Sequence, residues 1–211
     1  MMRKLNRTSV AAPGCLASYK HGADNWESVE SEHKAEIRKC LHVMQGQWCA
    51  YCEGALDVLG QHIEHFEPKS KRPQATFSWS NLFCSCQKLD SCGHFKDSGA
   101  GSYKQADLIN PCSDDPDTYF RFRSDGTISL RRGLSEQQRT RAETTLRVFN
   151  LDPSHGRLRQ MRKNATAGYV SLVDEAEGFT RDELGEFFAM ELKAARDQQF
   201  QTAIRHVLTE P

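Results

Sequence analysis

The sequence has no net charge and no long apolar run. Its 28 Lys and Arg residues are balanced by 28 Asp and Glu residues over 211 positions. No stretch of 18 apolar residues occurs, so we expect no membrane-spanning helix. The first 20 residues lack the apolar segment of a secretory signal, so we expect a cytoplasmic protein. No internal repeat or low-complexity tract is visible, and the length suits one or two domains with a substantial core.

Two groups of cysteines are spaced as metal ligands are. Eight cysteines without a visible signal favour a reducing compartment, with metal-bound thiolates rather than disulfides. Cys49 and Cys52 enclose two residues, a spacing that aims both sulfurs at one zinc ion. A second group, roughly 35 residues later, supplies Cys92 and either Cys86, which we favour, or Cys84. The other thiols are expected to be ordinary small apolar residues: Cys15, Cys40 and Cys112.

A set of polar residues lies between and just after these cysteines: His62, Glu64, His65, Asn81 and His94. Such side chains have no reason to cluster in an apolar core. Carboxylate, imidazole and carboxamide groups are, however, the parts that bind a hard divalent cation and activate water. A zinc ribbon that only stabilises a fold or binds a partner needs the cysteines alone, which leaves the polar set unexplained.

Four segments of the chain resemble, in their order, the HNH, or ββα-metal, nuclease motif. They read WCAYCE, HIEHFEPKS, WSNLFCSC and CGHFK. They are more similar still to the retron- and Septu-associated HNH endonucleases, the PtuB-like proteins. The similarity continues through the hairpin TYFRFRSDGTISL and the segment RAETTLRVFNLD, and covers roughly residues 45–163. One departure from many HNH proteins is that Gly93 stands between Cys92 and His94.

The resemblance implies a role for each site residue. His65 is expected to be the general base that takes a proton from the attacking water, and Asn81 to orient it. Glu64 and His94 are expected to bind a catalytic Mg²⁺ or Mn²⁺, with His62 as a further ligand or a supporting partner. A structural Zn²⁺ is expected on Cys49, Cys52, Cys86 and Cys92. Nucleic-acid contacts are expected from Lys69, Lys71, Arg72 and Lys96, with a merely solvated loop as the alternative for the first three.

The resemblance also implies a function and a partner. The expected activity is metal-dependent hydrolysis of phosphodiester bonds in nucleic acid, in a Septu-like antiphage system of a prokaryote, beside a PtuA-type ATPase. DNA is the favoured substrate. RNA, such as a tRNA, stays open because HNH chemistry needs no 2′-hydroxyl and no base-reading element is visible. The alternative from another class is a non-catalytic zinc module that docks onto the ATPase.

The expected fold is α+β, with a zinc-stapled ββα-metal HNH core inside a mainly helical protein. We divide the chain into an N-terminal arm and helix (1–46), a zinc-bound nuclease core (47–110), and a hairpin and helical C-terminal region (111–211). In the core we expect a strand through Gln61–Phe66, a loop over 67–76 and a second strand near Phe77–Trp79. A helix containing Cys92 to Lys96 follows.

Outside the core, the patterns predict helices and one hairpin. A first helix is expected from about Asn25 to Gln45, ended by Gly46. Asp125-Gly126 predicts a hairpin turn. Capping boxes begin helices at Ser135 and Thr180, Asp152-Pro153 begins another, and a last amphipathic helix holds Phe200 to Leu208.

Charge is distributed unevenly along the chain. Residues 118–163 hold 11 Lys and Arg against 4 Asp and Glu, residues 164–211 hold 4 against 9, and residues 1–117 hold 13 against 15. A neutral chain with one basic belt is expected to bind nucleic acid weakly by itself. We expect the ATPase to dock through the helices of residues 180–208 or through the N-terminal arm.

Overall fold

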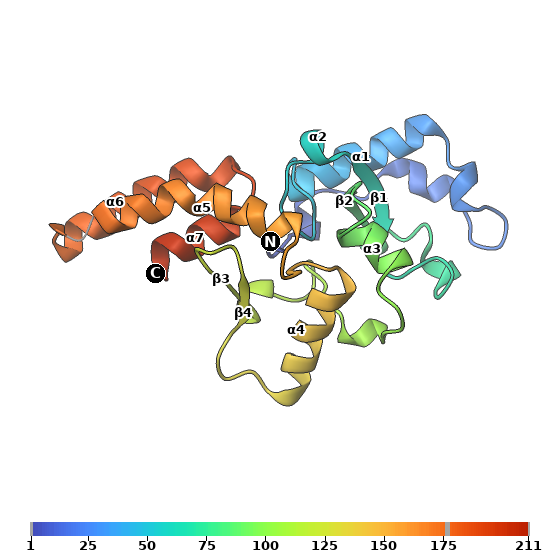
Figure 1. Ribbon diagram of the computed structural model, residues 1–211. Coiled ribbons are helices and arrows are strands. Elements are labelled where there is room, and N and C mark those ends of the chain that lie inside the picture. Colours follow the sequence, from blue (N-terminus) through green and yellow to red (C-terminus); the bar gives the residue numbers. More distant parts are fainter. Residues whose placement is uncertain (1, 176–177, 211) are drawn as a thin grey trace.

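The computed structural model of the protein describes residues 2–175 and 178–210 (Figure 1). Its centre is a small antiparallel sheet of β1 (Gln61–His65) and β2 (Leu82–Cys86), which pairs Gln61 with Cys86 and His65 with Leu82. Helix α3 (Cys92–Ser98) follows β2 and packs on it. This ββα unit within a mostly helical chain confirms the predicted α+β class.

The other elements surround this unit. They are α1 (Ser31–Gln45), α2 (Leu56–Leu59), β3 (Phe120–Phe122), β4 (Ile128–Leu130), α4 (Glu136–Val148), α5 (Arg157–Glu175), α6 (Arg181–Ala194) and α7 (Gln201–Thr209). Strands β3 and β4 form the predicted hairpin, and the capping boxes at Ser135 and Thr180 both form. Gly46 ends α1 at a φ of 68°, which glycine adopts without strain. None of the described helices combines the length and apolar character needed to cross a bilayer.

Three predicted boundaries are wrong. Helix α5 begins at Arg157 and not at Asp152-Pro153, because a turn at residues 154–155 separates Pro153 from the helix. The second core strand is Leu82–Cys86 and not Phe77–Trp79, because residues 79–81 form a 3-10 turn that precedes a fully buried strand. A strand buried along its whole length shows no alternation of polar and apolar residues, so its pattern was not decisive. Helix α1 begins at Ser31, because the Asn25 side chain caps a separate short turn by accepting from the backbone of Ser28.

The N-terminal arm packs on the protein's own core. Met2, Leu5, Cys15 and Leu16 are buried, and the backbone N–H of Met2 donates to the carbonyl oxygen of Tyr51 at 3.0 Å. One hydrophobic cluster runs from this arm through the ββα unit to the final helix. The arm is therefore part of the fold and not a free extension.

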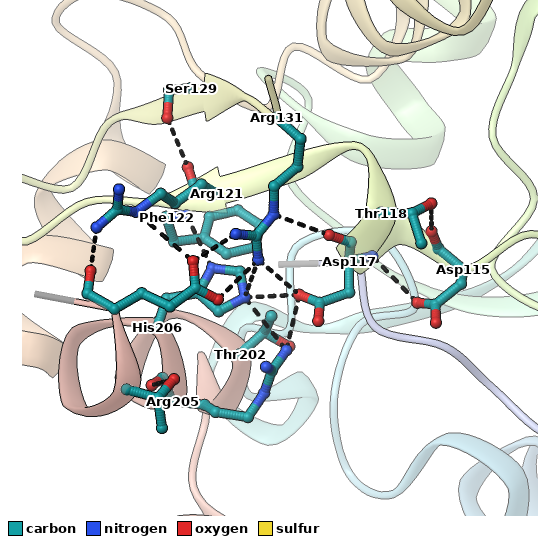
Figure 2. Close-up of polar contacts among 12 residues, drawn as sticks. Asp115, Asp117, Thr118, Arg121, Phe122, Ser129, Arg131, Thr202, Arg205 and His206 are labelled. Carbon is teal, nitrogen blue, oxygen red and sulfur yellow. Dashed lines mark hydrogen bonds and ion pairs between the residues drawn. The ribbon is translucent and has the colours of Figure 1, made fainter. Parts of the chain in front are cut away.

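Helix α7 is also anchored, on β3 and the turn before it (Figure 2). His206 has no exposed surface; its Nδ1 accepts from the backbone of Phe122 at 3.0 Å, and its Nε2 donates to Asp117 Oδ1 at 2.6 Å. This hydrogen bond holds the pKa of Asp117 well below its usual value, and a contact from Arg205 lowers it further. Burial of the carboxylate has the opposite effect but is outweighed. The apolar residues Ile204 and Leu208 face the interior. The predicted use of α7 as a free docking helix is therefore not supported by its packing.

A buried carboxylate joins α7 to the first cysteine pair. Glu53, the residue after Cys52, accepts from the backbone N–H of Thr202 at 3.0 Å and from its hydroxyl at 2.5 Å. The backbone N–H of Phe200 donates to the carbonyl oxygen of Glu53 at 3.1 Å. The carboxylate thus lies at the N-terminus of α7, where a negative charge is stabilised.

Candidate active site and cysteine cluster

Four cysteine side chains converge beside the end of β2. The Sγ atoms of Cys49, Cys52, Cys86 and Cys92 all lie within 4.8 Å of one another, and all four residues are buried. The backbone N–H of Cys86 donates to Cys49 Sγ at 3.3 Å, and that of Gly54 to Cys52 Sγ at 3.4 Å. A tetrahedral zinc ion with sulfurs at about 2.3 Å would hold them about 3.8 Å apart. The donor set and its spacing therefore suit a structural metal ion.

Cys84 stays outside this cluster. Its Sγ lies 3.2 Å from Gln61 Oε1 and 3.7 Å from His42 Nε2. Burial raises the pKa of the Cys84 thiol to about 12, which keeps it protonated. Of the two cysteines considered for the third ligand position, the structure places Cys86 with the others.

A second group lies between β1 and α3, where Glu64, His62 and His94 are neighbours. His62 Nε2 lies 3.3 Å from Glu64 Oε2, and the ring centroids of His62 and His94 are 4.2 Å apart. Glu64 is only 2% exposed, whereas both histidines are half-buried. Burial, assisted by the nearby His62, lowers the pKa of His94, so its imidazole is neutral and able to bind a metal.

Gly93 accounts for the departure of this motif from many HNH proteins. A Cβ atom at this position would lie 2.4 Å from Glu64 Oε2 and 3.0 Å from His62 Nε2. The backbone N–H of Gly93 also donates to Ser85 Oγ at 3.1 Å, which fixes the start of α3 against β2. The residue between Cys92 and His94 must therefore be small, because the Glu64 carboxylate occupies that space.

Lys96 is buried beneath this group and differs from the predicted phosphate contact. Its Nζ lies 2.8 Å from Glu64 Oε1 and 2.6 Å from Asp97 Oδ1, and it donates to the carbonyl oxygen of His65 at 3.0 Å. Burial opposes the charge, but the two carboxylates outweigh it and raise the pKa of Lys96 above its ordinary value. The structure thus places Lys96 inside the site and not on a surface open to nucleic acid.

His65, the predicted base, is the last residue of β1 and is 6% exposed. Its Nε2 lies 3.0 Å from the carbonyl oxygen of Thr76. A carbonyl only accepts hydrogen bonds, so the proton is on Nε2 and the lone pair is on Nδ1. The Trp26 ring packs edge to face on the imidazole, with centroids 4.5 Å apart. Burial lowers the pKa of His65 to about 4, so the imidazole is in its basic form at neutral pH.

Asn81 supports His65 indirectly and not by the direct contact that was predicted. Its Oδ1 accepts from the backbone of Glu67 at 2.7 Å, and its Nδ2 donates to the carbonyl oxygens of Glu67 at 3.0 Å and Ala75 at 3.1 Å. These bonds close the loop over residues 67–75. The next residue, Thr76, is the one that accepts from His65.

The three loop residues predicted to contact phosphates have partners within the chain. Lys69 Nζ lies 2.8 Å from Glu27 Oε1, and Arg72 Nη1 lies 2.5 Å from Glu67 Oε1. Lys71 Nζ lies 3.8 Å from the centroid of the Tyr103 ring. Lys71 and Arg72 are exposed and Lys69 is half-exposed, so all three are accessible. Their contact with nucleic acid stays a prediction.

Two buried polar atoms of the second group lack a hydrogen-bond partner within the described part of the chain. They are Glu64 Oε1 and His62 Nδ1. Lys96 Nζ lies 2.8 Å from Oε1 as an ion pair. Carboxylate oxygen and imidazole nitrogen suit Mg²⁺ or Mn²⁺. Among the described residues, the four cysteines are the group of ligand atoms that lies close enough together for one ion, so a catalytic ion at this second group stays a prediction.

Several residues of the site were not identified from the sequence. Trp26 and Thr76 contact His65, and Asp97 contacts Lys96. Trp26 precedes the motif and Thr76 lies in the loop, so neither has a fixed spacing that marks it. Asp97 directly follows Lys96, and nothing in the sequence distinguishes its carboxylate from an ordinary surface charge.

Comparisons with known proteins bear on this geometry. No family model matches the chain. The chain is 29% identical over 144 residues to the Vibrio cholerae "Retron Vc95 putative HNH endonuclease". The matched region covers 65% of this chain and 67% of that protein. It is 26% identical over 148 residues to the Septu protein PtuB of Bacillus mycoides, and 33% identical over 90 residues to that of Bacillus thuringiensis.

The matched region covers 58% of this chain and 48% of the Bacillus mycoides protein, and 42% of this chain and 33% of the Bacillus thuringiensis protein. The chain therefore spans less than half the length of these two relatives. All three matches nevertheless carry the names that the motif predicted. The resemblance of this chain to the retron- and Septu-associated HNH family is thus confirmed by its relatives.

Proposed function

We propose that the protein is a metal-dependent HNH endonuclease that hydrolyses phosphodiester bonds in nucleic acid, with DNA as the favoured substrate. The observation that carries the proposal is the arrangement at the end of β1. A neutral His65 directly follows Glu64, whose carboxylate lies beside His62, and the His62 ring in turn contacts the His94 ring. The names of the relatives, an HNH endonuclease and two Septu proteins, agree with it.

His65 would act as the general base through Nδ1. Its Nε2–H remains bonded to the Thr76 carbonyl oxygen, so the ring keeps its orientation while Nδ1 takes a proton from the attacking water. Trp26 covers part of the imidazole and keeps bulk water away from it. After the step, the imidazolium would be stabilised by the same carbonyl oxygen.

Glu64, His94 and His62 would hold the catalytic ion. When bound, a divalent ion stabilises the charge on the scissile phosphate and on the leaving oxygen. The cysteine cluster would serve the fold alone, because a closed four-sulfur site leaves no position for substrate. It fixes the first residue of α3, Cys92, and so sets the position of His94 two residues later.

The test is cleavage of plasmid and of total RNA by zinc-loaded protein, with and without the neighbouring ATPase. Cutting is expected to disappear in a chelator that leaves the fold intact and to return with Mg²⁺ or Mn²⁺. His65→Ala is expected to remain folded and inactive. Cutting by this variant at the wild-type rate would overturn the proposal. If the RNA alone were degraded, the substrate would be RNA and not DNA.

We also propose that the protein acts in a Septu-like antiphage system with a PtuA-type ATPase, which binds at α6. Apolar residues of the N-terminal arm, such as Leu5 and Leu16, and most residues of α7 are buried in the fold. By contrast, Met190 is 60% exposed and Phe179 is 45% exposed. Helices α5 and α6 extend together away from the ββα unit (Figure 1). Met190→Asp is expected to reduce co-purification with the ATPase. Val43→Asp on α1, a residue that is 62% exposed, is the matched control and is expected to have no effect.

A further inference from the structure

Lys96 carries a positive charge in the interior of the active site. Its side chain has no exposed surface, and it lies on α3 two residues after His94. An ammonium group removed from water must be compensated by nearby charges and hydrogen bonds. A lysine that only contacts nucleic acid has no need of such burial, so another role is indicated.

The three contacts of Lys96 connect α3 to both functional residues of β1. Its Nζ reaches Glu64 Oε1 at 2.8 Å and the carbonyl oxygen of His65 at 3.0 Å, and it is 2.6 Å from Asp97 Oδ1. Two of these contacts are hydrogen bonds, to His65 and to Asp97, and the third is the ion pair with Glu64. The same residue thus holds the carboxylate of Glu64 and the backbone of His65 at fixed positions relative to His94.

Lys96 also sets the charge of the site. The carboxylates of Glu64 and Asp97 carry two negative charges, and Lys96 cancels one of them. A divalent cation bound at Glu64 would lie a few ångströms from the ammonium and be repelled by it. Lys96 therefore orients the ligand while it weakens the attraction for the ion.

We propose that Lys96 is a positioning residue that fixes the Glu64 carboxylate and limits the affinity of the site for its divalent ion. The inference rests on the proposed function, because it takes Glu64 as a ligand of that ion. Replacing Lys96 by a neutral residue of similar length is expected to separate binding from catalysis. The ion binds more tightly because the repulsion is gone, and the reaction slows because Glu64 is no longer held.

The experiment measures Mn²⁺ binding to zinc-loaded protein without nucleic acid, from the electron paramagnetic resonance signal of free Mn²⁺. Lys96→Met is expected to bind Mn²⁺ about tenfold more tightly. At saturating Mn²⁺ its single-turnover cleavage is expected to fall by about tenfold or more, because a ligand misplaced by an ångström is costly. Lys39→Met makes the same chemical change on the exposed face of α1 and is expected to change neither quantity.

Asp97→Asn provides a second variant, with the opposite expected effect on Mn²⁺ affinity. Asp97 is exposed, so this variant is expected to fold. It removes a negative charge and is expected to weaken Mn²⁺ binding about threefold or more. Unchanged Mn²⁺ affinity in both folded variants, or a loss only of nucleic-acid affinity in Lys96→Met, would overturn the inference. A failure of the proposed function is distinguishable, because wild-type Mn²⁺ binding would then be insensitive to Glu64→Ala.

Discussion

Adding one methyl group at Gly93 is expected to displace the Glu64 carboxylate. The new Cβ would lie 2.4 Å from Glu64 Oε2 and 2.6 Å from its Cδ. Ordinary contacts between such atoms are about 3.5 Å, so the carboxylate must retreat by about 1 Å. The backbone cannot easily move instead, because Cys92 is held in the cysteine cluster and the N–H of Gly93 is bonded to Ser85.

A displacement of about 1 Å at a reacting centre costs roughly 10²-fold in rate. We therefore expect Gly93→Ala to lower single-turnover cleavage at saturating Mn²⁺ by about 10²-fold, with its zinc content retained. The cost in stability is expected to be small, because an overpacked contact costs about 1–3 kcal/mol and alanine recovers about 0.5–1 kcal/mol in a helix. The assay is plasmid nicking, with thermal unfolding measured on the same preparation.

Gly168→Ala is the matched control. It makes the same substitution within α5 at a position where a Cβ meets nothing within 4 Å, so cleavage is expected to be unchanged. If Gly93→Ala cut at a rate near that of Gly168→Ala, the carboxylate would not need its present position. The assignment of Glu64 as a ligand of the catalytic ion would then be refuted.

Three further outcomes are expected. His65→Ala should retain its zinc and lose about 10²–10⁴-fold in single-turnover cleavage, toward the larger value because one base activates the water; a rate within a few fold of wild type would contradict this role. Metal analysis should find one zinc ion per chain in Cys84→Ser, whereas Cys49→Ser should lose the ion and unfold in part; the reverse result would assign the ligand position to Cys84. Asp117→Asn should lower the free energy of unfolding by about 1–2 kcal/mol at pH 7, because it weakens the bond to His206. Since the folded pKa of Asp117 is depressed, this difference should persist above about pH 4 and shrink as the pH falls below it, as urea titrations would show.

The sequence predicted the parts of this protein that follow from local spacing. Cys49 and Cys52 lie in a tight turn that their spacing demands, and the capping box at Ser135 begins α4 as expected. Gly46 and the Asp125-Gly126 turn also lie where their conformations are required. These features depend on a few neighbouring residues, so a single sequence is enough to read them.

Features that depend on long-range packing could not be read in this way. The lysine after His94 was interpreted as a phosphate contact, since nothing local shows that Lys96 points into the interior toward Glu64. Asn81 was assigned to His65, whereas its amide closes the neighbouring loop. The amphipathic pattern of α7 was equally suited to a partner and to the protein's own core. Only the burial of Ile204 and Leu208 decides between them.

The bond between Glu53 and Thr202 has a consequence for the rate of folding. The two residues are 149 positions apart in the chain, so the surroundings of the first cysteine pair close only when distant segments meet. Contacts between residues far apart in sequence slow folding, because the entropy of the long loop is lost before the contact forms. Supplying zinc in excess is therefore not expected to accelerate the last step of refolding. In a chain that has bound zinc before α7 docks, the four-cysteine cluster would be complete while the Glu53 carboxylate beside it is still exposed. Hydrogen exchange during refolding would detect this intermediate, because the backbone amide of Cys86 would become protected before that of Ile204.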